Sequence, residues 1–211
     1  MNKASAQRLF VFGLGYVGLS FALAMRDAGW QVEGTCRTEK RRQELIQSGV
    51  KTFVFDGQTR CMEISQRVVV ADAILSSAPP NAAGDPVLDI FGADICRKDG
   101  FSWLGYLSTT GVYGDWDGKE VNENSGLRAT SERGLRRIAA EQAWLRLTNR
   151  KSLPAHIFRL AGIYGPGRNI LDRIRAGTAT RIQKPGHVFS RIHVDDIVST
   201  LAASILRPRA G

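Results

Sequence analysis

The sequence predicts a doubly wound α/β fold, in which helices cover both faces of a parallel sheet. An apolar run, a glycine-rich or polar turn and a helical pattern follow one another repeatedly, which is typical of parallel β-α-β units. The chain has 211 residues, of which 43% are hydrophobic and 23% are charged, and this composition suits one substantial core. We therefore expect one domain over residues 1–211.

Short apolar segments are the expected strands, at 8–13, 31–36, 51–56, 72–78, 101–109 and 154–160. The expected helices between them lie at about 15–28, 38–48, 86–98 and 131–149. The helix at 131–149 has the clearest pattern, since one face repeats at three- and four-residue steps through Leu135, Ile138, Ala139, Gln142 and Leu145. Thr130 or Ser131 is its expected N-cap.

The pattern loosens after residue 160. Residues 160–192 are interpreted as insertions on the substrate side of the sheet, with a short strand near "HVFSRI". A last helix opens at "HVDDIVSTLAASIL", where Asp195 or Asp196 is the expected cap and His193 has a structural role. The chain ends at "RPRAG", where such a helix would lead to a further element, so we expect a C-terminal substrate portion to be missing.

Composition narrows the classes of function. Cys36, Cys61 and Cys96 are far apart and form no CxxC pair, so we expect neither disulfides nor a metal site, and a reducing cytoplasm fits best. No uninterrupted apolar run reaches about 18 residues, so we expect no membrane span. The formal charge of +9 could attract nucleic acid, but the basic residues are dispersed and no aromatic residues alternate with them. Nucleic acid is therefore not an expected partner.

The stretch "FVFGLGYVG" places Gly13, Gly15 and Gly18 between an expected strand and helix, which is the context of a Rossmann dinucleotide loop. The first glycine permits a tight turn, the second a close approach to a pyrophosphate, and the third close packing of helix on strand. Tyr16 and Val17 belong to the same predicted site. The alternative is a glycine-rich turn without a ligand.

The end of the second strand indicates which dinucleotide binds. In sites that select NAD an acid accepts from the ribose hydroxyls there, whereas this chain has Cys36 followed by Arg37. A guanidinium suits a phosphate monoester, so NADP is preferred over NAD. Arg41 and Arg42 follow one turn later and have a solvated helix surface as their alternative.

Two further strand ends are predicted to line the same cleft. Asp56 could reach the adenine amino group, and its alternative is an aspartate that opens the turn before Gly57. Ser77 and Ala78 lie in "SSAPP", whose small residues and prolines suit a wall beside the ribose and nicotinamide, although a plain loop would look the same.

Taken in order, "GLGYVG", "LSTTGVYGD", "FRLAGIYGPGRN" and "FSRIHVDDI" resemble the extended short-chain dehydrogenase/reductase superfamily, in particular its NAD-dependent epimerase/dehydratase branch. The resemblance spans nearly the whole chain. It implies that Thr109 matches the strand-end Ser or Thr of the family, that Tyr113 packs near the cofactor and is a substrate-binding candidate, and that Arg168 grips an anionic substrate group. It also implies a homodimer through helix 131–149.

The chain departs from the family at the Tyr-x-x-x-Lys pair of that helix. Counted back from Glu141, Arg137 stands at the lysine position and Arg133 at the tyrosine position. An arginine has no accessible neutral form near pH 7, so Arg133 cannot relay a proton as a phenol does. Thr109 and Arg137 are therefore the catalytic candidates, through one hydrogen bond and through stabilisation of an oxyanion.

Two functions remain open from the sequence. The first is an NADP-dependent oxidoreductase, or an epimerase/dehydratase-like enzyme, with a non-standard acid/base, acting on a small carbonyl or a nucleotide-linked sugar. The second is a non-catalytic NADP-binding redox sensor or interaction module. The loss of the tyrosine beside an intact glycine loop motivates the second.

Overall fold

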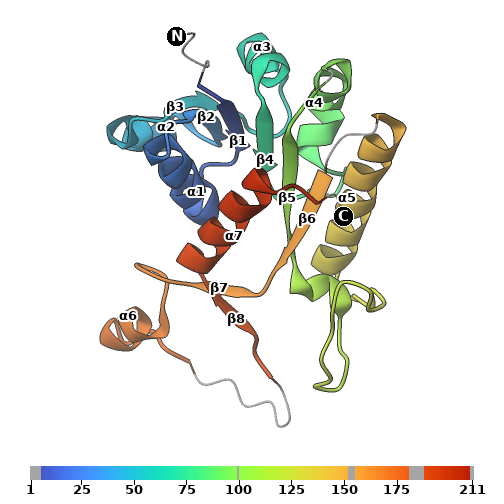
Figure 1. The fold of residues 1–211 in the computed structure, drawn as a ribbon. Helices are drawn as coiled ribbons and strands as arrows, with labels where there is room; N and C mark the ends of the chain where they lie inside the picture. The colour runs from blue at the N-terminus through green and yellow to red at the C-terminus, as the bar shows by residue number, and fades with distance from the viewer. Residues whose placement is uncertain (1–5, 99, 152–154, 181–187, 210–211) are drawn as a thin grey trace.

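The computed structural model describes residues 6–98, 100–151, 155–180 and 188–209, and its centre is a parallel sheet (Figure 1). The strands follow the order β3-β2-β1-β4-β5-β6. Their bounds are β1 Arg8–Phe12, β2 Gln31–Cys36, β3 Lys51–Val54, β4 Ala73–Ser76, β5 Trp103–Thr109 and β6 Ala155–Leu160. The order reverses between β1 and β4, and this confirms the predicted doubly wound fold.

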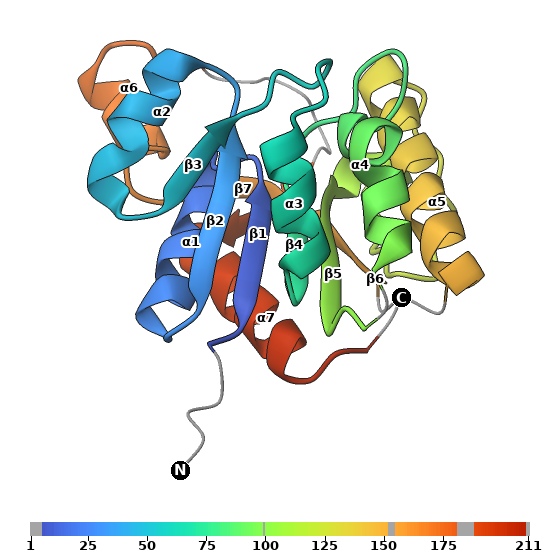
Figure 2. The same ribbon diagram turned by 90° about the horizontal axis from the view of Figure 1, so that it is seen from above.

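Helices pack on both faces of this sheet (Figure 2). One face carries α1 (Tyr16–Asp27) and α7 (Val194–Leu206), and the other carries α3 (Met62–Val70), α4 (Pro86–Arg97) and α5 (Glu132–Lys151). The strand β1 shows why both faces are covered, since Leu9 and Val11 belong to one core cluster and Phe10 and Phe12 to the other. A strand buried on both faces reads as a continuous apolar run.

The remaining elements lie near the strand ends. The helix α2 (Glu39–Leu45) continues into the 3-10 turn η1 (Ile46–Ser48), and η2 (Thr110–Tyr113) follows β5 directly. The segment predicted as an insertion forms β7 (Gly162–Tyr164), α6 (Ile170–Arg175) and β8 (Arg191–His193), with β7 and β8 paired in parallel. Figure 1 shows this ribbon and α6 beyond the ends of the main strands.

Several helices differ from the sequence-based expectation. The helix α3 was not expected between the third and fourth strands, because its nine residues hold too short an apolar pattern to be distinguished from a loop. In α7 the N-cap is His193, whose Nδ1 accepts the Asp195 N–H at 3.3 Å. The expected caps Asp195 and Asp196 lie in the first turn instead.

The prediction that the apolar face of α5 packs in the core is wrong, because several of its residues are exposed. Leu135 is 51% exposed, and Ala139 and Gln142 are also exposed. The buried face consists of Gly134, Ala140, Glu141 and Trp144. Periodicity missed it because one of its members is a charged residue that finds a partner inside the protein. The Ser131 Oγ accepts the Gly134 N–H at 3.2 Å, so Ser131 provides the expected cap.

Within the described residues no helix is both long and apolar enough to cross a membrane. The same residues include no cluster of three histidine, cysteine or acidic side chains suited to a metal ion.

Candidate functional site

The glycine loop is fixed against the neighbouring strand. The Gly13 N–H donates to the Thr35 Oγ1 at 3.0 Å, and the Leu14 N–H donates to the Thr35 carbonyl at 2.7 Å. Gly13 has a φ of +93°, a conformation that side chains rarely adopt. A Cβ there would lie 3.4 Å from the Ala78 nitrogen, so the loop after β1 also touches the loop after β4.

The other two glycines of the loop differ in their surroundings. A Cβ on Gly18 would lie 2.1 Å from the Gly13 carbonyl oxygen, so the helix can approach the strand this closely only with glycine at this position. A Cβ on Gly15 would meet nothing within 4 Å. Gly15 is the N-cap of α1 and offers no side-chain cap, so no capping side chain occupies the first N–H groups of the helix. Such a helix N-terminus suits an anion.

A pocket of about 520 Å³ lies in front of this loop. It brings together six of the predicted cofactor residues, namely Gly13, Gly15, Arg37, Asp56, Ser77 and Ala78. It also takes in residues that sequence reasoning did not select: Leu14, Thr35, Cys36, Arg41, Phe55, Gly57, Gln58, Pro79, Asn81 and Pro86. Tyr16, Val17 and Gly18 are not among the lining residues, since they lie behind the loop in α1.

The three arginines after β2 have different partners. Arg42 donates to both oxygens of Glu39, at 2.8 and 2.6 Å, and this hydrogen bonding lowers the pKa of Glu39 to about 2. Arg41 lines the pocket but pairs with Glu44 at 2.9 Å. Arg37 is exposed at the pocket, and no carboxylate pairs with it among the described residues. Arg37 is thus the guanidinium that remains available for a ligand.

Asp56 forms the turn that was its alternative interpretation. Its Oδ1 accepts the N–H groups of Gln58 at 2.8 Å and Thr59 at 3.0 Å. These bonds, with that from Thr59 the largest cause, hold the pKa of Asp56 below its usual value. The carboxylate also lines the pocket, and its Oδ2 lies 3.5 Å from the Thr59 hydroxyl.

Thr109 ends β5 and, with the 3-10 turn η2 that follows it, forms the segment 109–113, here called the Thr109 turn. The Thr109 Oγ1 accepts the Gly111 N–H at 3.1 Å and caps η2, which leaves its own hydroxyl proton to donate. The Tyr113 side chain is buried, and its hydroxyl accepts a hydrogen bond from Arg159 at 3.1 Å. Thr110 and Tyr113 line a second pocket, of about 930 Å³, with the following loop and Arg191.

Arg137 is held against the strand that ends in Thr109. Its Nη1 donates to the Leu107 carbonyl at 2.6 Å and to the Tyr106 hydroxyl at 3.0 Å. Burial raises the pKa of the Tyr106 phenol. Arg133, at the family's tyrosine position, is exposed.

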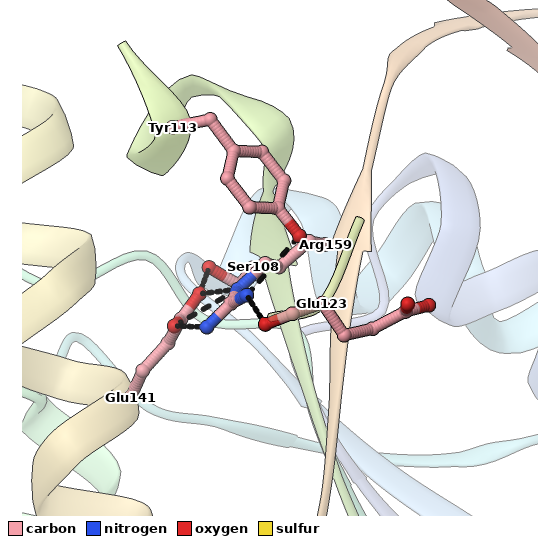
Figure 3. A network of polar contacts seen from close by, with 5 residues as sticks. All are labelled: Ser108, Tyr113, Glu123, Glu141 and Arg159. Atoms are coloured by element: carbon pink, nitrogen blue, oxygen red, sulfur yellow. Dashed lines mark hydrogen bonds and ion pairs between the residues drawn. The ribbon is translucent and has the colours of Figure 1, made fainter. Parts of the chain in front are cut away.

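Sequence reasoning did not identify a buried polar network behind this turn (Figure 3). Arg159 and Glu141 form an ion pair at 2.9 Å, and the Ser108 hydroxyl donates to Glu141 at 2.5 Å. Arg159 also donates to the Glu123 carbonyl at 3.4 Å. Arg159 lies in the "FRLAGIYGPGRN" stretch and Glu141 in the helix at 131–149, but no pattern in the sequence indicates that the two side chains pair.

The "YGPGR" turn contacts the first residue of α1. The Tyr16 hydroxyl donates to the Pro166 carbonyl at 3.0 Å, and the Arg168 guanidinium lies 5.5 Å from the centre of the Tyr16 ring. Arg168 and Arg191 also line a third pocket, of about 950 Å³, beside β7 and α6. Asp172 in its wall already pairs with Arg175 at 3.3 Å and accepts from Asn169 at 2.6 Å.

Comparisons with known proteins agree with this architecture. A protein of Silicibacter pomeroyi DSS, described as a functionally unknown conserved protein, is 42% identical over 98% of this chain and 70% of its own, with a TM-score of 0.87. Protein YeeZ of Escherichia coli (strain K12) is 24% identical over 97% of this chain and 75% of its own length. The fold also resembles the UDP-glucuronic acid 4-epimerase of Bacillus cereus in complex with UDP-glucuronic acid and NAD, at 17% identity over 97% and 74% of the two chains and a TM-score of 0.76.

The family model for the NAD dependent epimerase/dehydratase family matches residues 93–211, which is more than half of the chain. The match includes the Thr109 turn, the α5 helix and the "YGPGR" turn. Together with the glycine loop and the parallel sheet, it shows that this chain belongs to the NAD dependent epimerase/dehydratase family.

Proposed function

We propose that this chain is an NADP-preferring oxidoreductase, or an epimerase/dehydratase-like enzyme, that acts on a small carbonyl or a nucleotide-linked sugar. The observation that carries the proposal is the convergence of the glycine loop, Arg37 and the Ser77 loop on one pocket. These elements follow β1, β2 and β4, so their positions are set by the sheet. In open α/β sheets ligands bind at this edge, where the strand order reverses.

The residues of the pocket fit a dinucleotide. The open space at Gly15 and the free N–H groups of α1 suit the pyrophosphate, and Arg37 suits a phosphate on the adenosine ribose. Ser77 and Ala78 would border the nicotinamide half. When bound, the nicotinamide would accept or donate the hydride. The Bacillus cereus epimerase of similar fold is in complex with NAD. The proposed preference of this chain for NADP therefore rests on Arg37 and not on that similarity.

Thr109 and Arg137 have different proposed roles, because their hydrogen bonds leave different groups available to a substrate. Thr109 uses its oxygen to cap η2, so its proton can be donated to a substrate oxygen. Arg137 is anchored by neutral oxygens of Leu107 and Tyr106, so its charge is available to stabilise an oxyanion nearby. Neither Thr109 nor Arg137 can act as a base in the way that the phenol of the family's Tyr-x-x-x-Lys pair does. The acid/base of the reaction is therefore non-standard.

The third pocket, beside β7 and α6, supports a substrate with an anionic group. Arg168 and Arg191 line the third pocket, and neither pairs with a carboxylate in the described ranges. Asp172, the acid in the same wall, is already satisfied by Arg175 and Asn169. A phosphate of a nucleotide-linked sugar or a carboxylate would complement these two guanidinium groups.

Turnover tests the enzymatic proposal. Purified chain is mixed with NADPH or NADP and a panel of ketones and nucleotide sugars, and product formation is measured. We expect turnover of at least one substrate and a loss of about 100-fold in kcat for Thr109→Ala, the usual effect of removing one hydrogen-bond donor to an oxyanion. Thr200→Ala, on the exposed side of α7, is the matched control. Absence of turnover across the panel would contradict the proposal.

The alternative is a non-catalytic NADP-binding redox sensor or interaction module. Arg133 at the tyrosine position favours it, because that side chain cannot relay a proton. This alternative expects tight NADP binding, no hydride transfer and a partner whose affinity changes with the nucleotide. Partner binding that is the same with and without nucleotide would contradict the sensor.

The assembly and the compartment are also proposals. Exposed Leu135, Ala139 and Gln142 give α5 a stripe that supports a homodimer through this helix. Cys36, Cys61 and Cys96 are all free thiols, which supports a reducing cytoplasm.

A further inference from the structure

The ion pair between Glu141 and Arg159 is buried directly behind the Thr109 turn (Figure 3). The Glu141 side chain is 1% exposed and that of Arg159 is 19% exposed. Arg159 Nη2 donates to Glu141 Oε2 at 2.9 Å, and its Nε lies 3.2 Å from both carboxylate oxygens. The pair joins the middle of α5 to β6, the last strand of the sheet.

This pair holds the Thr109 turn on both flanks. On one side the Ser108 hydroxyl donates to Glu141 Oε1 at 2.5 Å. On the other side Arg159 Nη1 donates to the Tyr113 hydroxyl at 3.1 Å, and the guanidinium lies 5.1 Å from the centre of that ring. Ser108 and Tyr113 are both buried. The intervening turn, with Thr109 at its start, therefore has both of its ends attached to one ion pair.

The pair also attaches the loop between η2 and α5. Arg159 Nη1 donates to the Glu123 carbonyl at 3.4 Å. Earlier residues of this loop, including Trp116 and Lys119, line the pocket of about 930 Å³ beside Thr110. One guanidinium thus connects the sheet, the Thr109 turn and the loop that borders the proposed substrate pocket.

Stability alone gives a weak reason for such a pair. Removing a carboxylate and a guanidinium from water costs several kcal/mol, and apolar residues of similar volume often serve a core equally well or better. The neighbours of Glu141 on the same helix face, Ala140 and Trp144, are apolar residues packed in the core. Unlike apolar packing, an ion pair forms directional hydrogen bonds, and each of these bonds fixes the position of one partner group.

We propose that Glu141 and Arg159 are positioning residues that act through Thr109 on the nicotinamide half of the dinucleotide and on the substrate carbonyl. This inference rests on the proposed function. The adenosine half is assigned to Gly13, Arg37 and Asp56 at the ends of β1, β2 and β3, and none of these contacts the pair. The two halves of the ligand should therefore respond differently when the pair is broken.

Calorimetry with two probes separates these halves. NADPH carries both, whereas adenosine 2′,5′-bisphosphate carries only the adenosine half and its ribose phosphate. For Glu141→Gln we expect the affinity for NADPH to fall about tenfold, which corresponds to about 1.4 kcal/mol. The affinity for adenosine 2′,5′-bisphosphate should stay within about twofold of the original chain, and Glu141→Asp should restore part of the NADPH affinity.

The matched control is a second ion pair, at 2.6 Å, between the buried carboxylate of Asp94 in α4 and the partly exposed guanidinium of Arg60, which precedes α3. The Asp94 side chain is 2% exposed, so Asp94→Asn imposes a similar burial defect. It should lower the unfolding temperature without changing the ratio of the two affinities. If Glu141→Gln does not fold, Arg159→Lys replaces it, because lysine keeps the charge and loses the planar fork.

The outcomes are distinct. Loss of NADPH affinity alone supports the positioning role. Equal losses for both probes, or no loss for either, overturn it and leave the pair with a structural role. If the unsubstituted chain binds neither probe, the proposed function itself fails and this inference fails with it.

Discussion

Arg42 and Glu39 form a two-pronged ion pair along α2, with hydrogen bonds of 2.8 and 2.6 Å. This pair occupies the Arg42 guanidinium, and Arg42 does not line the dinucleotide pocket. Arg41 reaches the pocket but is paired with Glu44. Of the three arginines that follow β2, Arg37 is therefore the one that lines the pocket without a carboxylate partner among the described residues.

Arg37→Ala should remove the preference for NADP. A hydrogen bond to a charged group contributes about 1.5–3 kcal/mol, so we expect the ratio of NADP to NAD affinities to fall by about tenfold or more. Arg42→Ala is the matched control and should leave the ratio unchanged. Equilibrium titration of both variants measures the effect, and an equal drop in both variants would refute the assignment to Arg37.

Substitutions at two glycines of the loop should affect different properties, namely the free energy of unfolding at Gly18 and the dinucleotide affinity at Gly15. Gly18→Ala places a methyl group 2.1 Å from the Gly13 carbonyl oxygen, so it should lower the free energy of unfolding by about 1–3 kcal/mol. Gly15→Ala meets no atom within 4 Å and should unfold like the original chain, yet lose dinucleotide affinity because the methyl group occupies the ligand's space. Denaturant unfolding and titration test both. Unchanged binding in Gly15→Ala would place the pyrophosphate elsewhere.

Asp85 should give stability a specific pH dependence. It is buried at the start of α4, where it accepts the N–H groups of Val87 and Leu88 and that of the Trp144 indole. Burial raises its pKa above the unfolded value of about 4. The folded chain then holds this proton more tightly than the unfolded chain, so the contribution of Asp85 falls as the pH rises from about 4 through the raised pKa.

Asp85→Asn lacks this titration. The difference in free energy of unfolding between the original chain and Asp85→Asn should therefore decrease with rising pH over that window. Urea unfolding at a series of pH values measures it, with Asp196→Asn, which alters an exposed carboxylate in the first turn of α7, as control. Parallel curves for the original chain and Asp85→Asn would show that burial of Asp85 has no such effect.

The exposed stripe of α5 should control assembly. Leu135 is 51% exposed, so Leu135→Glu should change the fold little but place charge in a dimer interface. We expect sedimentation to show a dimer for the original chain and a monomer for this variant. Leu206→Glu, at the end of α7, alters a still more exposed leucine away from α5 and should leave the dimer intact. A monomeric original chain would argue against the interface.

The sequence was sufficient where local chemistry decides structure. The six strands of the main sheet and the glycine loop between the first strand and the first helix were predictable, since each shows in a short local pattern. The α5 core face was not, because Glu141 is a charged residue that becomes buried only when Arg159 reaches it from β6. The His193 cap and the Tyr16 contact with Pro166 likewise depend on tertiary geometry.

The pocket lined by Gly13 and Arg37 is proposed to bind a dinucleotide, and calorimetry on the purified chain measures this binding. NADP, NADPH, NAD and NADH are titrated separately under identical conditions. We expect saturable binding, with NADP and NADPH bound at least about tenfold more tightly than NAD and NADH, in keeping with one additional charged contact. Absence of binding by all four would contradict it.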